Sequence, residues 1–333
     1  MFSSECFHGS KGKFPVGFIV WNMGRQVPIS AQNIVLDVYD RNCEKVGTKQ
    51  IITNERDTFL NKWPKRVRNS GVLPPFSSAI TISNRTIDVR DKVAEGFLCS
   101  LMCCGNDMQH YNYVAILSGP QASAGSYSVV PQNFERSMIL HTVRRVCKPT
   151  WDNDRDQFYQ PHSDILPAEF VSDCVVWSAF APSNNTASLK DVEYNGQVYQ
   201  IDNQMFPFLL HDVKTWDCSL SDIRVQLFAA NEDRFMARWL YQHPLSKEAQ
   251  LVYDKAKCLY MCVYMNLGKI RWLDYKIQLW DMGWWQVKSA AKDVPEALPL
   301  LSDLKRSMDV LGDKILQALP RLGFIPPPVQ PLN

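Results

Sequence analysis

The 333-residue chain lacks the short motifs that most often identify an enzyme from its sequence. Its 15 glycines are scattered, and no two of them stand in the Gly-x-Gly spacing that lets backbone amides approach a phosphate or a nucleotide. No Gly-x-Ser-x-Gly string is present, and the six histidines are dispersed along the chain. The sequence therefore argues against a self-sufficient nucleotide-dependent enzyme and against nucleophilic catalysis.

Metal-binding patterns are also missing. None of the ten cysteines forms a Cys-x-x-Cys pair, so the zinc-ribbon pattern is absent. The only close trio is Cys99, Cys103 and Cys104, and the nearest histidine is His110. We expect these cysteines to be reduced, mostly buried thiols of a cytoplasmic protein.

Long apolar runs and strong net charge are absent as well. The longest apolar stretches, residues 18–21 and 258–267, fall far short of the roughly 20 residues that a bilayer span needs. The formal net charge is only +2, so a contact with nucleic acid has to be local. With 46% apolar residues, 21% charged residues and a mean hydropathy of −0.22, the chain should fold without a membrane partner. The first residues show no secretion signal, which favours a cytoplasmic location.

The fold class predicted from the pattern is α/β to α+β. Residues 16–21 form a continuous apolar run that indicates a strand buried on both faces of a sheet. Residues 34–40 and 48–53 flank a turn and predict a hairpin. Further strands are expected at 111–117 and 127–130.

Later segments change to helical periodicity. Apolar residues recur at helical spacing between Gln132 and Lys148, and Ser246 can cap a following helix. Another amphipathic helix is expected near residues 300–319, and a hairpin turning at Asn195-Gly196 is expected at 191–201. We therefore predict a β-rich region at 1–130, a mixed region at 131–245, and a helical region with a Pro-rich tail at 246–333.

Several blocks resemble the adenine-specific DNA methyltransferases of restriction-modification systems. The opening segment 1–21 is similar to the part that follows the catalytic tetrapeptide of that family and forms a late strand of its class I methyltransferase sheet. Residues 148–158, 169–177, 184–188 and 280–287 look like blocks further downstream. The resemblance implies that the chain is a C-terminal portion of such an enzyme.

The upstream half of that family carries an S-adenosylmethionine loop and an Asn/Asp-Pro-Pro-aromatic tetrapeptide that holds the target amino group of a flipped adenine. Neither is present here. The nearest strings, Leu73-Pro-Pro-Phe76 and Ile325-Pro-Pro-Pro328, begin with side chains that cannot accept a hydrogen bond. We expect no catalytic residue and no cofactor in this chain, with S-adenosylmethionine entering only through a partner that supplies the missing half.

DNA contact is expected from two basic segments. Cations neutralise phosphates, and an aromatic ring among them can stack on an unpaired base. For the first segment a solvated basic loop is the explanation that we favour, and for the second the helix macrodipole explains the cations at its end as well as DNA contact does. The candidate residues are Lys62, Trp63, Lys65, Arg66, Arg68, Arg144, Arg145, Lys148, Trp151 and Arg155.

Three further patterns have a structural explanation that we favour. Asp152, Asp154 and Asp156 could bind a cation but lack the glycine and distal glutamate of a calcium loop, so ion pairing is expected. Asp274-Tyr-Lys276 matches the acid-x-Lys string of nucleases only weakly. The tryptophans at 272, 280, 284 and 285 are expected in the core.

The sequence leaves three hypotheses. The first is a DNA-binding or target-positioning half of an adenine methyltransferase, with DNA and a catalytic protein as partners. The second is a non-enzymatic interaction or decoy protein, derived from a methyltransferase, that binds a host protein complex. The third is a decayed fragment, which would expose sheet edges and aggregate.

Overall fold

The computed structural model describes residues 1–10, 13–18, 24, 34–51, 58–67, 93–119, 125–194, 197–271 and 274–331. Within these ranges the protein is of mixed α/β class, with three sheets and eight α-helices. The helices are α1 Phe134–Val146, α2 Ala168–Phe180, α3 Leu210–Val213, α4 Ser221–Ala229, α5 Phe235–Gln242, α6 Lys247–Met265, α7 Trp284–Ala290 and α8 Ala297–Leu322. The strands are β1 Phe2–Ser3, β2 Pro15–Val16, β3 Ile34–Tyr39, β4 Lys45–Ile51, β5 Cys99–Cys103, β6 Val114–Leu117, β7 Tyr127–Val129, β8 Asn184–Asn185, β9 Leu189–Tyr194, β10 Gln197–Ile201 and β11 Gln330–Pro331. Short 3-10 helices are η1 Ser4–Cys6, η4 Leu60–Lys62, η7 Met108–His110, η8 Pro131–Asn133, η9 Leu267–Lys269 and η10 Ala291–Asp293.

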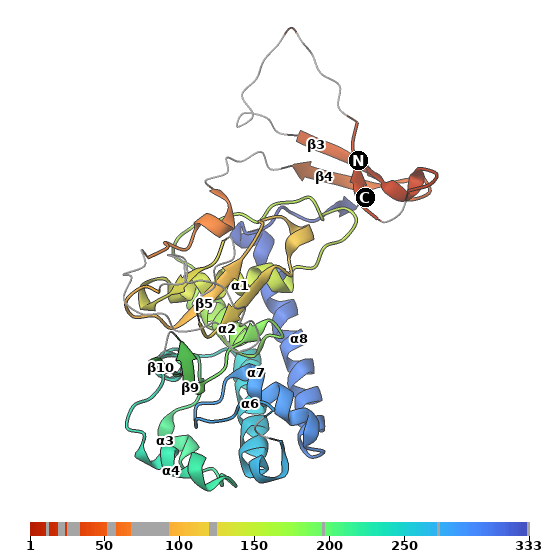
Figure 1. Cartoon of the computed structure of the whole chain (residues 1–333). Helices are drawn as coiled ribbons and strands as arrows, with labels where there is room; N and C mark the ends of the chain where they lie inside the picture. Colours follow the sequence, from red (N-terminus) through yellow and green to blue (C-terminus); the bar gives the residue numbers. More distant parts are fainter. Residues whose placement is uncertain are drawn as a thin grey trace.

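The two ends of the chain meet in one sheet at the edge of the molecule (Figure 1). Its strand order is β11-β4-β3-β1-β2, and β1 is parallel to β3 while the other neighbours are antiparallel. Val38 is its one fully buried apolar side chain among the described residues. A buried ion pair joins the sheet to the main body, because Lys49 Nζ lies 2.6 Å from Asp156 Oδ2.

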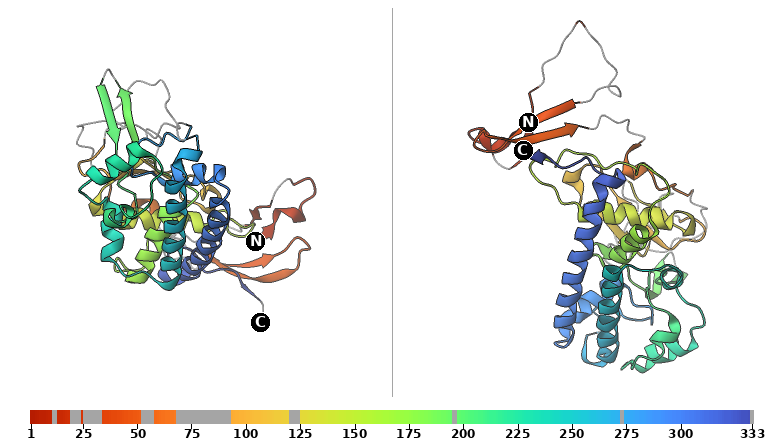
Figure 2. Two further views of the ribbon diagram at one scale, coloured as in Figure 1. Left: turned by 90° about the horizontal axis from the view of Figure 1, so that it is seen from below. Right: turned by 180° about the vertical axis from the view of Figure 1, so that it is seen from behind.

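The main body is built in layers on a four-stranded sheet. The order is β7-β5-β6-β8, with β5 antiparallel to β6 and β7, and β6 parallel to β8. Helix α1 packs on this sheet, α2 packs on α1, and the long helices α6 and α8 pack on α2 (Figure 1). The β9–β10 hairpin projects from the body on the side away from the N-terminal sheet (Figure 2).

One hydrophobic core serves the described part of the chain from Leu60 to Ile325. It draws residues from all three regions expected from the sequence, 1–130, 131–245 and 246–333. The main core therefore draws on all three regions, and Ala187, Leu189 and Ile201 form a second, small cluster. The described part of residues 1–51 packs separately, because it contributes no side chain to the main core.

Most of the predicted elements are present. The expected hairpin at 34–53 is β3 and β4, and the expected helix after Gln132 is α1. The Ser246 hydroxyl accepts a hydrogen bond from the Ala249 amide at 3.1 Å, which confirms it as the cap of α6. The helix expected near 300–319 is α8.

One strand prediction is wrong. The run 16–21 was expected to be a strand buried on both faces, but among its described residues only Val16 belongs to a strand, Pro15–Val16, and Phe18 is 71% exposed. Phe18 faces solvent because no described helix covers the small N-terminal sheet on this side (Figure 1). Residues 19–21 lie outside the described residues.

A charge cluster connects the helical layers. Lys314 of α8 lies 2.5 Å from Glu169 and 2.9 Å from Asp173, both on α2, and 2.9 Å from Glu248 on α6. Asp173 also accepts a hydrogen bond at 2.5 Å from Ser246. Burial is the main influence on this carboxyl group and raises its pKa, while Ser246 and Lys314 lower it. The cluster therefore orients three helices with one cation.

The start of α7 lies directly against the loop after β8. A Cβ on Gly283 would be 2.0 Å from the carbonyl oxygen of Thr186, a distance that no side chain tolerates. This contact lets the fully buried Gln286 make four hydrogen bonds. Its Oε1 accepts from the amides of Ser188 at 3.1 Å and Gly283 at 2.8 Å, and its Nε2 donates to the carbonyls of Ser188 at 2.9 Å and Lys276 at 2.8 Å.

We expect Gly283→Ala to lower the free energy of unfolding by about 3 kcal/mol, because the new methyl group has to push two backbone segments apart. The measurement is urea denaturation of the full chain. The control is Gly268→Ala, where the nearest atom to the added Cβ is Ser219 Oγ at 3.8 Å. Its expected change is within about 0.5 kcal/mol. Equal effects of the two substitutions would contradict the role assigned to this contact.

Candidate nucleic-acid interface

The first basic segment is anchored by its apolar members. Leu60 is fully buried and its amide donates to the carbonyl of Phe158 at 3.0 Å. Lys62, Lys65 and Arg66 are exposed, so the charged side chains stand on a backbone that is fixed from below. Arg66 donates to the carbonyl of Gly125 at 3.3 Å. The arrangement can present cations to a phosphate chain.

Trp63 does not lie where the sequence predicted. The ring is 4% exposed, and its Nε1 donates to Asp164 Oδ1 at 3.0 Å. The guanidinium carbon of Arg136 lies 5.0 Å from the ring centroid, and the ring of Phe324 packs edge-on at 6.0 Å. Because the ring is almost completely covered, stacking of a nucleic-acid base on Trp63 is ruled out in this conformation.

Arg144 is the second correction. It is fully buried and donates to the carbonyls of Gly105 at 3.0 Å, Cys104 at 3.2 Å and His110 at 2.7 Å. Burial is the main influence and lowers the pKa of its guanidinium. The side chain holds the loop between β5 and β6 onto the end of α1. It is a structural residue, out of reach of DNA.

The other predicted residues lie at the C-terminal end of α1 or beyond it. Lys148 and Arg155 are exposed, while Arg145 and Trp151 are half-buried. Arg155 donates to Gln109 Oε1 at 2.8 Å, and the guanidinium carbon of Arg145 lies 5.6 Å from the Tyr111 ring. Helix α1 is about 20 Å long. It separates this group, at its C-terminal end, from Lys65, which lies at its N-terminal end. Arg68 lies outside the described residues.

The acidic run forms ion pairs. Asp156 pairs with Lys49, and Asp154 Oδ1 lies 3.8 Å from Arg155 Nε. Among the residues described, no group of three or more His, Cys, Asp or Glu side chains could hold a metal ion. Asp274 of the nuclease-like string pairs with Arg271 at 3.3 Å, in a turn rather than a strand.

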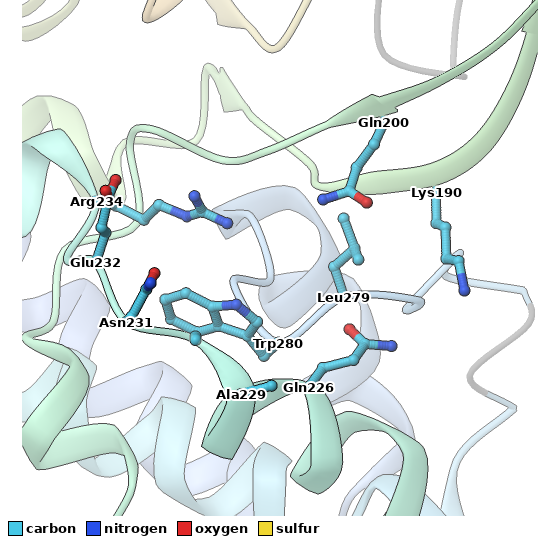
Figure 3. Close-up of a pocket in the computed structure, with 10 residues that line it drawn as sticks. Lys190, Gln200, Gln226, Ala229, Asn231, Glu232, Arg234, Leu279 and Trp280 are labelled. Carbon is cyan, nitrogen blue, oxygen red and sulfur yellow. The ribbon is translucent and has the colours of Figure 1, made fainter.

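Sequence reasoning missed a polar pocket of about 390 Å³ beside the β9–β10 hairpin (Figure 3). Lys190 and Gln200 of the hairpin line the pocket, together with Gln226 of α4. Arg234, the residue directly before α5, also lines it. Trp280 forms one wall, although only 5% of it is exposed. The predicted burial of Trp280 and Trp284 is confirmed, since both are 5% exposed and belong to the main core.

Arg234 is held in a buried ion-pair network at this pocket. Its Nε lies 2.7 Å from Asp281 Oδ2, and its Nη1 lies 3.2 Å from Asp202 Oδ2. Its guanidinium carbon lies 5.0 Å from the centroid of the Trp280 ring. Burial raises the pKa of the Asp281 carboxyl group, while Arg234 lowers it. Because Asp281 and Asp202 neutralise the charge of Arg234, this side chain adds little positive charge to the pocket. Its main role is to hold the pocket wall in place.

One buried acceptor at the pocket has no partner among the described residues. Gln226 Nε2 donates to the carbonyl of Gln278 at 3.0 Å, but its Oε1 accepts no hydrogen bond from them. An unsatisfied buried polar atom costs about 1–3 kcal/mol, so an N–H donated by a ligand would be favoured here, but only after the Gln226 side chain moves, because protein atoms cover Oε1. Exocyclic amino groups of adenine and cytosine are donors of this kind.

The pocket and the basic segment are linked through the N-terminal end of α1. Asn133 Nδ2 donates to the carbonyl of Lys65 at 3.1 Å. The next residue, Phe134, packs edge-on against Phe235 at 4.9 Å, and Phe235 follows Arg234. In Figure 1 the segment at 58–67 and the β9–β10 hairpin lie on the same side of the molecule.

Sites for S-adenosylmethionine often use glycines that allow close backbone approach, or a helix N-terminus beside the ligand. No described glycine lines this pocket, while helix α5 begins beside it, directly after Arg234, whose guanidinium is already paired with Asp281 and Asp202.

His141 is the most strongly perturbed histidine and lies in the core. Its Nδ1 and Nε2 lie 2.8 Å from the hydroxyls of Ser178 and Ser183, and the ring is fully buried. Burial, with a smaller effect of Arg145, lowers the pKa of His141 from its ordinary 6.5 to about 3. A neutral ring that no substrate can reach is a structural hydrogen-bond centre and not a catalytic base.

The buried ring makes stability depend on pH. Its folded pKa is depressed, so protonation favours the unfolded chain and stability is lost as the pH falls below 6.5, down to about 3. Between pH 7 and pH 5 we expect His141 to remove about 2 kcal/mol from the unfolding free energy. Urea denaturation at both values should show that His141→Gln lacks this loss. The exposed control, His211→Gln, should keep it, and equal pH dependence in all three proteins would contradict the assignment.

Comparison of the chain with protein-family models, with curated proteins and with solved structures found no match. Among the described helices, none combines the length and apolar character needed to cross a lipid bilayer.

Proposed function

We propose that the chain binds DNA as the target-positioning part of an adenine-specific DNA methyltransferase of the restriction-modification type. The observation that carries this proposal is the division of the segment 60–66, whose apolar side chains are buried while Lys62, Lys65 and Arg66 face solvent. Cations on an anchored segment neutralise phosphates without a large loss of backbone entropy. The resemblance of the blocks at 148–158, 169–177, 184–188 and 280–287 supplies the methyltransferase part of the proposal.

Methyl transfer itself is assigned to a protein partner. The partner would carry the S-adenosylmethionine site and the amine-holding tetrapeptide that this sequence lacks. The N-terminal sheet is the part we assign to that contact, because its outer strands β2 and β11 are only two residues long and, among the described residues, leave most of the sheet edge open. In this arrangement the chain holds DNA, and the partner alkylates it.

The polar pocket is assigned to an unpaired base of the bound DNA. The exposed Lys190 and Gln200 can reach the edge of a base at the mouth, and Gln226 Oε1 would become an acceptor if its side chain turned toward the base. Trp280 contributes an edge and not a stacking face, because it is 5% exposed and Arg234 lies over its ring. Selectivity would then come from hydrogen bonds to the base more than from stacking.

Removal of the three exposed cations should weaken DNA binding and its salt dependence together. We expect Lys62→Ala, Lys65→Ala and Arg66→Ala, combined, to reduce the slope of log affinity against log salt by about 2 to 3, since each phosphate contact contributes about 0.9. The measurement is fluorescence anisotropy with a labelled duplex at several salt concentrations.

The matched control for this experiment removes the same charge elsewhere. Lys247, Lys292 and Lys305 are exposed on α6, η10 and α8, and their combined change to alanine should leave the slope unaltered. An equal loss in both triple variants would mean that only net charge matters. Absence of DNA binding by the unaltered chain would reject the proposal.

The pocket is tested with DNA that offers an extrahelical base. We expect the unaltered chain to prefer a duplex with a bulged adenine over a fully paired duplex. Lys190→Ala combined with Gln200→Ala should reduce that preference about tenfold, the effect of losing a base-specific contact. The control combines Lys247→Ala with Gln242→Ala, both at exposed positions. A preference that survives the pocket substitutions would exclude this pocket as the base site.

A second candidate function is the decoy protein that binds a host complex. The observation that favours it is an exposed aromatic group on the N-terminal sheet, where Phe18 is 71% and Phe7 is 41% exposed. Their ring centroids lie 6.4 Å apart, and Phe18 also packs edge-on against Phe2 at 5.7 Å. A chain that binds protein through this surface and has no affinity for DNA would fit this alternative.

A further inference from the structure

Two cysteines far apart in the sequence meet on the N-terminal sheet. Cys6 ends the short helix η1, and Cys43 lies in the turn between β3 and β4. Cys43 is exposed and Cys6 is half-buried, so small molecules in solution can reach this place. The DNA-binding proposal uses neither residue.

The turn holds the two thiols together through Asp40. The carbonyl oxygen of Asp40 accepts hydrogen bonds from Cys6 Sγ at 3.0 Å and from the Cys43 amide at 3.1 Å. The Asp40 carboxylate accepts from the amides of Asn42 at 2.8 Å and Glu44 at 3.0 Å, which fixes the turn. Cys6 is also the main influence on the pKa of Cys43 and raises it, as expected of neighbouring thiols. Because one carbonyl oxygen binds both residues, rotation of the two side chains is the motion that would bring the sulfurs to bonding distance.

Cys43 also occupies a costly backbone conformation. Its φ is +61°, a left-handed value that glycine or asparagine adopts more easily than cysteine. Turn geometry alone therefore gives no reason for a cysteine at this position. The need for a thiol beside Cys6 would explain why a cysteine occupies position 43.

The remaining described cysteines differ in their surroundings. Burial raises the pKa of the thiols at 99, 103, 147, 174 and 218, which keeps them protonated and unreactive. Cys258 is exposed on α6 and therefore serves as an internal comparison for a reactive thiol outside the pair.

We propose that Cys6 and Cys43 form a reversible disulfide by thiol–disulfide exchange with a small disulfide such as oxidised glutathione. The exposed Cys43 sulfur, as thiolate, attacks the small disulfide, forms a mixed disulfide and releases one thiol. The Cys6 sulfur then attacks Cys43, closes the protein disulfide and releases the second thiol. Two protein thiols are oxidised, and one disulfide is reduced to two thiols that carry the protons.

The disulfide would be a crosslink within the N-terminal sheet. It would tie η1, and with it β1, to the turn of the β3–β4 hairpin, in a sheet whose one fully buried apolar side chain among the described residues is Val38. A crosslink stabilises most where packing is thin, because it restricts the unfolded segment. The neighbouring Cys6 thiol raises the pKa of Cys43, so the exchange should accelerate as the pH rises through the alkaline range.

The test treats the full chain with mixtures of oxidised and reduced glutathione, with a chelator present to exclude metals. After acid quenching and alkylation, peptide mass mapping identifies the linked cysteines. We expect one intramolecular Cys6–Cys43 disulfide, formed at least about tenfold more readily in the native chain than in the chain unfolded with urea. Cys6→Ser should instead trap glutathione on Cys43.

Cys258→Ser is the control and should form the same disulfide as the unaltered chain. Limited proteolysis of the oxidised form should be slower within residues 1–51 and unchanged elsewhere, and dithiothreitol should reverse this protection. Glutathione adducts on Cys43 of the unaltered chain without a link to Cys6, or a disulfide between two chains, would overturn the proposal. So would equal formation in the native and unfolded chains.

Discussion

The approach of Gly283 to the Thr186 carbonyl is the contact on which the packing of the main body depends. Because no side chain separates them, α7 begins directly on the loop after β8. Gln286 can then fill the gap with four hydrogen bonds, and the Trp284 indole donates to the Ala181 carbonyl at 3.0 Å. The central sheet, the helical layers and the β9–β10 hairpin all meet here. Each buried polar group that the junction brings together is therefore close to a partner from a distant segment.

The same junction positions the candidate pocket. Strand β9, which provides one wall of the pocket, begins directly after Ser188. Trp280, which provides another wall, lies shortly before Gly283. Both walls are therefore fixed where the loop after β8 meets the start of α7. Gln278 connects them, because its Oε1 accepts from the Lys190 amide at 3.1 Å and its carbonyl accepts from Gln226. The segments 184–188 and 280–287 lie against each other at this place. Their separation in the sequence concealed that they form one structural unit.

Sequence patterns predicted those elements that have one apolar face. Helices α1, α6 and α8 each show such a stripe, and β3 and β4 flank a clear turn. Helix α2 was not predicted, because its side chains are buried almost all round and show no contrast between faces. Among the basic residues, the pattern could not separate the exposed Lys62 from the buried Arg144. A sequence shows that a residue is charged, but not whether its side chain will face solvent or the interior.

By itself the sequence determined the hairpins, the amphipathic helices, the cap at Ser246 and the lack of a donor loop, because each depends on residues within one or two turns of chain. Only the tertiary structure decided which candidate residues can meet a ligand. Trp63 points inward because Asp164 and Arg136 come from other segments to cover it, and Arg144 because the carbonyls of 104, 105 and 110 surround its guanidinium. Exposure is a property of the neighbours that folding brings together, and those neighbours are far away in the chain.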